Sequence, residues 1–349
     1  VNYKTNAMLR KILTLSTAAC ACLSLNAQKD SSKKATTVLS GSIDAYYRYS
    51  FSDAPTKTNN FTSFTNSQNS FELGMASFRV DHAVGKVSAV ADIGFGRRAQ
   101  EFSYNDAGSL AAIKQMYLSY AVTDHLKLTM GKWATHIGYE LVDAPGNRNY
   151  SMSYGFSYGP FFHTGVKADV SLGGKTAMMI GVANPTDQST TTTSAKFILA
   201  QFSTATKDDK VKGYFNFQGG NGITQYNMVI TGALSDQLGI AYDGSMQCLK
   251  SAGQSSNWKS HALYLNYDPV SSLGFTLRQD YFDDRSFSPI GIGGKIYATT
   301  LSANIKHQNL TIIPEFRMDN SASDVFFKGS SSTRTKSTMA FLIAAVYKF

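Results

Sequence analysis

The chain has 349 residues, of which 12% are aromatic and only 16% are charged, and its formal net charge is +9 at pH 7. A soluble domain usually has about a quarter of its residues charged, yet no apolar run after residue 27 reaches the roughly 18 residues of a membrane-spanning helix. A helical membrane protein is therefore excluded, and the modest charge does not indicate nucleic-acid binding. This composition is typical of a transmembrane β-barrel, in which lipid-facing and lumen-facing residues alternate.

Residues 1–27 have the pattern of an upstream extension followed by a secretory signal peptide. A basic start, Met8–Lys11, precedes the mostly apolar segment Ile12–Leu25, which is too short to span a bilayer as a helix. Cleavage after Ala27 would leave Cys248 as the only cysteine, which excludes an intrachain disulfide. It would also remove three basic residues and no acid, which lowers the net charge from +9 to +6. A buried N-terminal helix and a lipoprotein signal stay open as alternatives.

Sixteen segments then carry apolar residues at every second position, which is the periodicity of β-strands with one apolar and one polar face. Residues 28–37, rich in Lys, Ser and Thr, form a flexible lead-in before them. We predict an all-β fold, a transmembrane antiparallel up-and-down β-barrel over 38–349 with about 16 strands, with 14 to 18 as the open range. The expected strands are 43–51, 71–80, 87–95, 112–122, 125–136, 161–171, 175–183, 194–203, 210–218, 223–233, 237–248, 257–268, 272–282, 295–307, 309–319 and 337–349.

Two positions interrupt this periodicity. The apolar face of the second strand includes Met75, and its phase shifts at Ala76-Ser77, which predicts a β-bulge. Pro314 lies within a predicted strand, where it removes a hydrogen-bond donor from the ladder. We therefore expect a bulge or an irregular point at Pro314.

The connections between the predicted strands alternate in length. Short turns such as Val84–Lys86 and Gln308-Asn309 alternate with long Gly-, Ser- and Asn-rich segments, apart from the short Gly219–Gly222 link. Outer-membrane barrels have short periplasmic turns and longer outer loops, so an even strand count predicts that both termini are periplasmic. The expected long loops are 52–68, 97–110, 137–160, 184–193, 249–256, 283–294 and 320–336.

The last predicted strand ends in Tyr347-Lys-Phe349, with aromatic residues on one face. We expect this strand to pair with the first one near Ile43–Phe51 and to close the barrel. Tyr347 and Phe349 then belong to an aromatic girdle at the periplasmic rim. They also resemble a C-terminal signal that the barrel-assembly machinery reads, and girdle anchoring alone is the alternative. The aromatic strands as a whole would also fit a soluble β-sandwich.

Charged residues fall on the polar face of many predicted strands. A charge on the lipid face is costly, so we expect these residues to face the lumen. A 16-stranded barrel is wide enough for an aqueous channel, so we expect them to line water. The set mixes six basic and seven acidic residues and does not settle ion selectivity. The predicted pore-lining residues are Asp44, Arg48, Glu72, Arg79, Asp92, Lys167, Asp169, Lys212, Arg278, Asp280, Glu315, Arg317 and Asp319.

Residues with catalytic or metal-binding potential are scarce. No histidine pair has a metal-ligand spacing and no cysteine cluster exists, so we expect neither a metal nor another cofactor. Asp143, His136 and His163 could converge across one loop as a hydrolase site at the rim. Polar loop residues are the simpler interpretation of these three.

The segment from 132 to 165 is too aromatic for a solvated loop, and we expect it to pack on the barrel wall, in the lumen or on a partner. Its residues Tyr139, Glu140, Asp143, Arg148, Tyr150, Tyr154 and Tyr158 are the predicted constriction or capping set. The segment contains the motifs Gly138-Tyr-Glu140, Asp143-Ala-Pro-Gly-Asn147, Tyr150-Ser-Met-Ser153 and Gly159-Pro-Phe-Phe-His-Thr-Gly165. With these motifs it resembles the OmpL-like β-barrel porin family of Gram-negative bacteria, which implies an outer-membrane porin and supplies no catalytic residues.

We therefore expect a non-enzymatic porin that lets small hydrophilic solutes diffuse across the outer membrane, surrounded by outer-membrane lipid and lipopolysaccharide. We expect the 137–160 loop to fold into or over the mouth of the pore. A non-transport surface barrel, acting as an adhesin or as a subunit of an envelope complex, is the alternative. The sequence does not decide between a monomer and a homo-oligomer.

Overall fold

The computed structural model describes residues 34–52, 54, 59–251, 253–284, 286, 293–329 and 333–349. The predicted signal peptide, 1–27, and residues 28–33 of the predicted lead-in lie outside the described residues. The described strands all belong to one compact unit, Thr36–Phe349. None of the helices among the described residues is long and apolar enough to cross a membrane.

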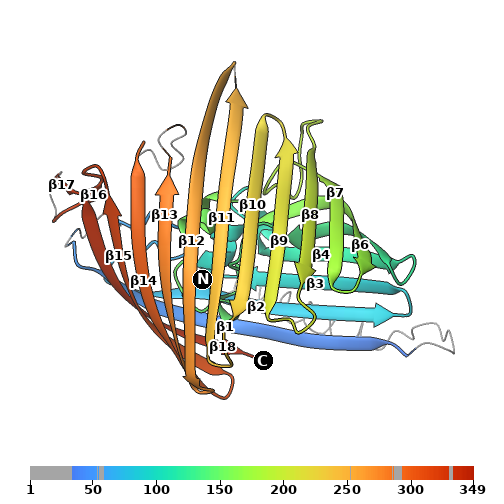
Figure 1. Cartoon of the computed structure of the whole chain (residues 1–349), viewed down its shortest axis with the longest axis horizontal. Helices are drawn as coiled ribbons and strands as arrows, with labels where there is room; N and C mark the ends of the chain where they lie inside the picture. The colour runs from blue at the N-terminus through green and yellow to red at the C-terminus, as the bar shows by residue number, and fades with distance from the viewer. Residues whose placement is uncertain are drawn as a thin grey trace, which may run out of the picture. The chain divides into compact units, whose positions relative to one another are not determined.

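Sixteen antiparallel strands form one closed barrel (Figure 1). Each strand pairs with its neighbours in chain order, so the predicted all-β, up-and-down antiparallel barrel of 16 strands is confirmed. In Figure 1 the front wall crosses over the rear wall because the strands of a barrel are tilted. The strands are β1 (Thr36–Ser50), β2 (Ser70–Val84), β3 (Val87–Phe95), β4 (Ile113–Ala121), β5 (Leu126–Ala134), β6 (Phe162–Gly173), β7 (Thr176–Ala183), β8 (Phe197–Ala205), β9 (Val211–Gly220), β10 (Ile223–Ala233), β11 (Leu238–Ser251), β12 (Gln254–Val270), β13 (Leu273–Asp283), β14 (Lys295–His307), β15 (Leu310–Ser321) and β18 (Ser337–Lys348).

The other elements belong to the connections that leave the barrel strands at one rim, which we call the loop rim. They are α2 (Arg97–Phe102), the 3-10 turns η2 (Gly108–Ala112) and η3 (Ala144–Gly146), α3 (Tyr154–Tyr158), and a small hairpin of β16 (Phe326–Phe327) and β17 (Arg334–Thr335). The opposite rim carries only short turns, and we call it the short-turn rim. Strand β1 ends and β18 begins at the long connections of the loop rim, so β1 begins and β18 ends at the short-turn rim.

The barrel is closed by β1 and β18, as predicted. Their ladder runs from the pair Ser42 and Lys348 to the pair Ser50 and Ala340. Phe349 continues it, because its carbonyl accepts a hydrogen bond of 2.9 Å from Gly41 N and its own amide donates one of 3.0 Å to Gly41 O. Closure leaves the barrel without an unpaired strand edge, which a lipid environment requires.

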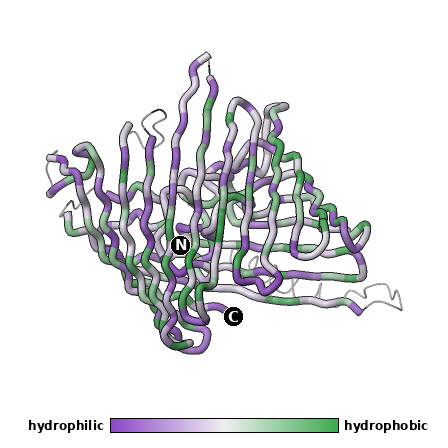
Figure 2. The backbone as a smooth tube through the Cα atoms, viewed as in Figure 1, coloured by the Kyte–Doolittle hydropathy of each residue, from purple (hydrophilic) through white to green (hydrophobic). Residues whose placement is uncertain are grey.

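The two faces of the wall differ in chemistry. Outward positions are apolar and exposed, as at Phe71 (87%), Leu73 (80%) and Met130 (71%), whereas inward positions such as Thr300 and Ser302 are polar and buried. Figure 2 shows hydrophobic and hydrophilic residues alternating along the strands. The period-two pattern thus reflects lipid on one side of the wall and a polar lumen on the other.

The predicted bulge in the second strand exists, but it lies two residues earlier than expected. The β1–β2 register shifts between the pairs Ile43–Ala76 and Ala45–Leu73, so the extra residue is at Gly74-Met75. Met75 was expected on the apolar outer face and is instead buried, at 2% exposure. The expectation was wrong because the shift comes before Met75, which thereby changes face.

Two other expectations about strand geometry have different outcomes. The predicted long loop 249–256 is wrong, because β11 extends to Ser251, β12 begins at Gln254, and these two residues pair with each other. Pairing between β14 and β15 is interrupted opposite Pro314 but resumes without a register shift, so Pro314 marks an irregular point and not a bulge.

A charge introduced on the outer face tests the lipid-facing assignment. Leu301 is the central residue of β14 and is 53% exposed, and Leu301→Arg should lower the free energy of unfolding by about 2–4 kcal/mol because it places a charge near the bilayer midplane. Leu234→Arg, in a turn of the short-turn rim, should cost only about 0–1 kcal/mol. Urea unfolding in lipid vesicles measures both costs, and equal costs would contradict the assignment.

Candidate pore site and the loop that occupies it

The connection between β5 and β6, residues 135–161, lies inside the barrel, and we call it the lumen loop. Near its start, Gly138 N donates to Asn227 Oδ1 of β10 at 3.1 Å and Tyr139 N donates to Asp243 Oδ2 of β11 at 2.9 Å. Further along, the Tyr150 hydroxyl donates to Asp44 Oδ2 of β1 at 2.5 Å. Strands β10 and β1 are seven positions apart in the 16-strand order, so the loop crosses the lumen.

Arg278 on β13 holds two parts of the lumen loop at once. Its side chain is completely buried and forms an ion pair with Glu140 at 2.8 Å. It also donates to the carbonyls of Ser151 and Met152 at 2.6 and 3.1 Å, while its Nε bonds Asp280 at 3.0 Å. A buried ion pair is stable only when its remaining donors are bonded, and here the loop backbone supplies the acceptors.

Glu315 on β15 holds the loop from the acidic side. Its carboxylate accepts hydrogen bonds from the amides of Tyr150 and Ser151 at 2.8 and 3.1 Å and from Ser302 Oγ at 2.8 Å. Hydrogen bonds between a carboxylate and backbone amides are charge-assisted and stronger than neutral ones. Glu315 therefore fixes the Tyr150-Ser151 part of the lumen loop against β14 and β15.

Two residues further along β15, Arg317 and Asp319 form a second anchor. They make a two-bond ion pair, with Nε and Nη2 of Arg317 at 2.9 and 2.8 Å from the carboxylate. Arg317 Nη1 donates to Met152 O at 2.8 Å and the Tyr154 hydroxyl donates to Asp319 at 2.9 Å. The anchor thus binds both the backbone and a tyrosine of the lumen loop.

On the β1 side, Tyr150 is held by Asp44 and by Arg98 of α2. The Arg98 guanidinium lies 4.6 Å from the centre of the Tyr150 ring and donates to the carbonyls of Val142 and Tyr150, each at 3.2 Å. The bulge places Gly74 beside this contact, where a Cβ atom would lie 1.7 Å from Asp44 Oδ2. A glycine is required here because any side chain would displace the Asp44 carboxylate.

The thirteen predicted pore-lining residues all occupy inward positions of their strands, but most do not contact water. Glu72, Arg79, Lys167, Asp169 and Lys212 are partly exposed. The other eight differ from the expectation because they are buried, most of them beneath the lumen loop: Asp44, Arg48, Asp92, Arg278, Asp280, Glu315, Arg317 and Asp319.

The partly exposed charges gather toward the short-turn rim, apart from Glu72, which pairs with Arg97 at 3.2 Å near the loop rim. Arg79 pairs with Asp81 at 2.7 Å on β2, and Lys167 pairs with Asp169 at 3.3 Å on β6. Water therefore reaches these charges from the short-turn rim up to the level of the lumen loop.

The predicted loop residues all contact the wall or another loop. Tyr139 packs on Tyr264 with ring centres 4.7 Å apart, and Tyr158 donates to Phe61 O at 2.6 Å. Asp143 accepts a 2.5 Å bond from Lys114 Nζ. The remaining one, Arg148, binds the wall through Asp268 on β12, with N–O distances of 2.9 and 2.8 Å.

His136 of the lumen loop and His163 of β6 do not form the suggested hydrolase site with Asp143. His136 and His163 lie together, with ring centres 5.2 Å apart, but they bond Phe217 O and Thr135 Oγ1. Asp143 binds Lys114 instead. Burial lowers the pKa of His136 to about 4, so it is neutral at pH 7. Among the described residues no group of three or more metal-ligating side chains is placed to hold a metal ion.

Asp187, in the loop between β7 and β8, supports the end of the lumen loop and was missed by the sequence analysis. Its Oδ1 accepts hydrogen bonds from the amides of Phe161 and Phe162 at 2.7 and 2.9 Å, and its Oδ2 accepts one from the Tyr104 hydroxyl at 3.1 Å. Burial raises the pKa of Asp187 to about 7. Arg98 was also missed, since the six-residue helix α2 is too short to carry a periodicity that marks an inward residue.

Tyr347 and Phe349 lie on the outer face at the short-turn rim and are about half exposed, at 44% and 51%. The Phe349 ring lies 6.0 Å from that of Phe78 and 6.4 Å from that of Tyr347. It covers Gly41, where a Cβ atom would lie 2.5 Å from the ring. This aromatic cluster fits an interfacial position, and the assembly-signal role stays a prediction.

A double-mutant cycle tests the anchoring of the lumen loop. Arg278→Met alone should lower the free energy of unfolding by about 3–5 kcal/mol, because it leaves Glu140 buried without its partner. Arg278→Met with Glu140→Met should cost less than the two single changes added together. Urea unfolding of the four proteins gives the coupling energy, and a coupling near zero would contradict the contact.

The pH dependence of stability tests the burial of Asp187. Because its pKa is raised to about 7 from the ordinary 3.8, the folded protein binds more protons than the unfolded protein between these values. The contribution of Asp187 to the free energy of unfolding should therefore fall as the pH rises from about 4 to 7. Asp187→Asn removes this dependence. The free energy of unfolding of the variant, measured by urea unfolding, should therefore increase relative to that of the wild type as the pH rises from about 4 to 7. Asp236→Asn, in an exposed turn, is the control, and a constant difference for Asp187→Asn would overturn the assignment.

Comparisons with known proteins agree with this architecture. The sequence matches the family model described as "Putative beta-barrel porin-2, OmpL-like" over residues 36–349. No curated protein matches the chain. Similar solved structures include the anion-selective porin from Comamonas acidovorans (12% identity, TM-score 0.61, 90% of this chain and 100% of that chain covered). Others are the outer membrane channel DcaP of Acinetobacter baumannii (13%, 0.59, 90% and 97%) and the trimer form of OmpT from Vibrio cholerae (11%, 0.61, 90% and 99%).

At these identities the solved structures establish the fold, whereas the family model covers every strand of the barrel. The family resemblance seen in the lumen-loop motifs is therefore confirmed. The chain belongs to the OmpL-like β-barrel porin family and is a protein of the outer membrane.

Proposed function

We propose that this barrel is a porin through which small hydrophilic solutes diffuse passively, in the space that the lumen loop leaves inside the wall. The observation that carries the proposal is the lumen loop itself, which is fixed across a polar lumen by buried charges of β1, β13 and β15. A loop so anchored narrows the route without closing the barrel at its rims. Selection by size then follows from the fixed width between loop and wall.

The part of the route toward the short-turn rim carries partly exposed charges. Arg79, Lys167, Asp169 and Lys212 are partly exposed there, and we assign them to the pore lining. The buried charges under the lumen loop have a different role, which is to position the constriction. Opposite charges on the exposed wall, such as Lys167 and Asp169, supply a local field that acts on passing ions.

The orientation follows from the lengths of the connections. Short turns are periplasmic in outer-membrane barrels, so the short-turn rim, with the start of β1 and the end of β18, faces the periplasm. The outer face then contacts lipid, with lipopolysaccharide around the loop rim. Tyr347 and Phe349 take the position of the signal that the barrel-assembly machinery reads. Association into a homo-oligomer is compatible with this arrangement, and one of the similar structures is a trimer form.

A non-enzymatic channel is also favoured by the contacts of the suggested hydrolase residues. Asp143 is bound to Lys114 and cannot orient either histidine. The neutral His136 donates to a backbone carbonyl and is not positioned to take a proton from a serine.

The second candidate is a non-transport surface barrel, either an adhesin or a subunit of an envelope complex. The observation that favours it is the burial of the eight wall charges. A lumen loop that fills the whole cross-section of the barrel at its position would block the passage of solutes. Purified protein that shows no ion conductance but co-purifies with another envelope protein would support this candidate over the porin.

Deletion of residues 147–158 tests the constriction. The deletion removes the part of the lumen loop that contacts β1, β13, β14 and β15 and exposes their charges to water, so single-channel conductance in planar bilayers should rise several-fold. Deletion of 190–193, a Thr-rich segment at the loop rim, is the matched control and should leave the conductance unchanged. Equal conductance of the wild type and the 147–158 deletion would sink the assignment of the loop as a constriction.

A further inference from the structure

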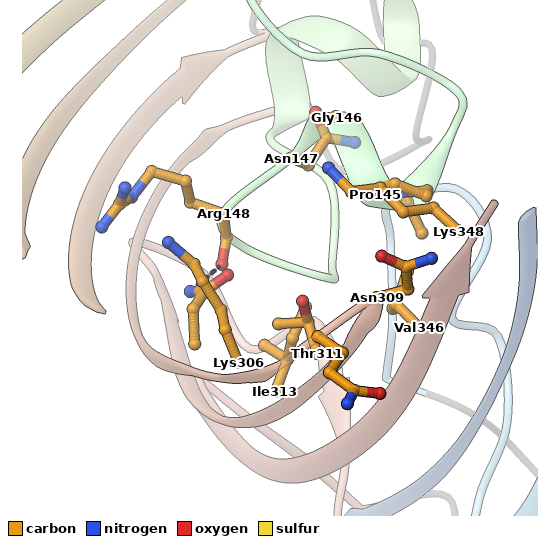
Figure 3. A pocket seen from close by; sticks show the side chains of 13 residues that line it. Pro145, Gly146, Asn147, Arg148, Lys306, Asn309, Thr311, Ile313, Val346 and Lys348 are labelled. Atoms are coloured by element: carbon orange, nitrogen blue, oxygen red, sulfur yellow. Dashed lines mark hydrogen bonds between the residues drawn. The ribbon is translucent and has the colours of Figure 1, made fainter. Parts of the chain in front are cut away.

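A cavity of about 290 Å³ lies between the tip of the lumen loop and the wall at the short-turn rim. Its lining comes from Ala144–Arg148 of the loop, from β14, β15 and β18, and from the turn Gln308-Asn309 (Figure 3). We call it the rim chamber. Since the turn residues are exposed, the chamber opens at the mouth that a solute meets from this side.

The charged residues that line the rim chamber are all basic: Arg148, Lys306 and Lys348. The two lysines come from β14 and β18, which flank β15, so their backbones lie about 10 Å apart. Figure 3 shows Lys306 and Arg148 on one side of the chamber and Lys348 on the other. An anion in the chamber would therefore meet positive charge from two sides.

One of the three cations is already neutralised. Arg148 makes its two-bond ion pair with Asp268, and Lys306 Nζ is 3.9 Å from the same carboxylate, which is too far for a hydrogen bond. Within the described part of the chain, neither Lys306 Nζ nor Lys348 Nζ donates a hydrogen bond to a protein acceptor. The chamber thus keeps a positive charge on two lysines that have donors to offer.

The lumen-loop side of the chamber is fixed by hydrogen bonds, which favours the binding of a ligand at a defined position. Asn304 Nδ2 donates to Arg148 O at 2.8 Å, and Arg148 Nε donates to Thr276 at 2.7 Å. The side-chain amide of Asn147 donates a hydrogen bond to Leu141 O at 2.6 Å, which fixes the position of this residue. A site that is fixed before the ligand arrives spends less free energy on ordering its groups.

We propose that the rim chamber binds small organic or phosphate anions and makes this mouth of the channel prefer anions. The inference rests on the proposed porin function for its biological role, but binding itself does not require conduction. The volume equals that of about ten water molecules, so the ligand is a solute with about ten non-hydrogen atoms or fewer. Lys306 and Lys348 bind its negative groups, and the amides of Gln308 and Asn309 lie at the mouth to bind its other oxygens.

Equilibrium binding tests the proposal on the full-length barrel in detergent. The probes are succinate and inorganic phosphate, with succinamide as an uncharged molecule of the same size as succinate. Lys306→Gln with Lys348→Gln should raise the Kd of the anions by about tenfold or more, which corresponds to about 1.4 kcal/mol. Lys207→Gln with Lys210→Gln removes two exposed lysines from another turn of the same rim and should leave the Kd unchanged.

Reversal potentials in planar bilayers under a KCl gradient give the second readout. The wild type should prefer chloride, and the Lys306/Lys348 variant should lose most of that preference while its conductance remains. The inference would be overturned if the anions did not bind or bound with the same Kd as succinamide. It would also be overturned if the control variant raised the Kd of the anions as much as the Lys306/Lys348 variant does. Conduction without anion binding would support the porin function and refute the anion site. Anion binding without conduction would refute the porin function and support the anion site in the rim chamber.

Discussion

Sixteen strands enclose more space than their own side chains fill, and the polar groups that they direct inward have to be hydrogen-bonded. The lumen loop meets this requirement. Arg278 and Glu315 bind its carbonyls and amides, and Asp44 binds its Tyr150 hydroxyl. Removing the loop would leave these charges to water, whereas removing a charge would leave its partner buried and unpaired, which costs several kcal/mol. Wall and loop are therefore stable together in one arrangement, which gives the proposed constriction a fixed width.

The same constraint divides the lumen into two regions with different tasks. Under the loop, charges are buried and serve structure. Toward the short-turn rim, Arg79 and Lys167 stay partly exposed, and the rim chamber adds Lys306 and Lys348. Burial makes a charge costly to lose, and exposure makes it available to solutes. Selectivity can therefore change through the exposed residues without loss of the barrel.

The strands were predictable because lipid acts on every second residue. The expected segments 87–95, 223–233 and 295–307 coincide with β3, β10 and β14. Prediction failed for the parts of strands that extend beyond the bilayer. There β11 continues to Ser251 and β12 begins at Gln254, and because both segments are polar, their sequence resembles that of a loop.

The site was predictable only in part. Periodicity shows which face of a strand Arg278 occupies, but not whether that face meets water or a loop, because this depends on the path of residues 135–161. The aromatic content of those residues indicated that they would pack, and their tyrosines do contact the wall. Arg98 and Asp187 could not be found, because they lie in the connections between strands, Arg98 in the short helix α2, and bind backbone groups distant in sequence.

The central claim is that the lumen loop lies across the barrel against β12 to β15, and a disulfide tests it most directly. A Cβ atom at Gly155 would lie 3.3 Å from Ser260 Cβ of β12, close to the Cβ separation of a disulfide. In a background with Cys20, Cys22 and Cys248 replaced by serine, Gly155→Cys with Ser260→Cys should form a disulfide in the native outer membrane. Gly155→Cys with Ser119→Cys, on the opposite strand β4, should not. Failure of the first pair to form a disulfide, or equal reaction of both pairs, would contradict the account.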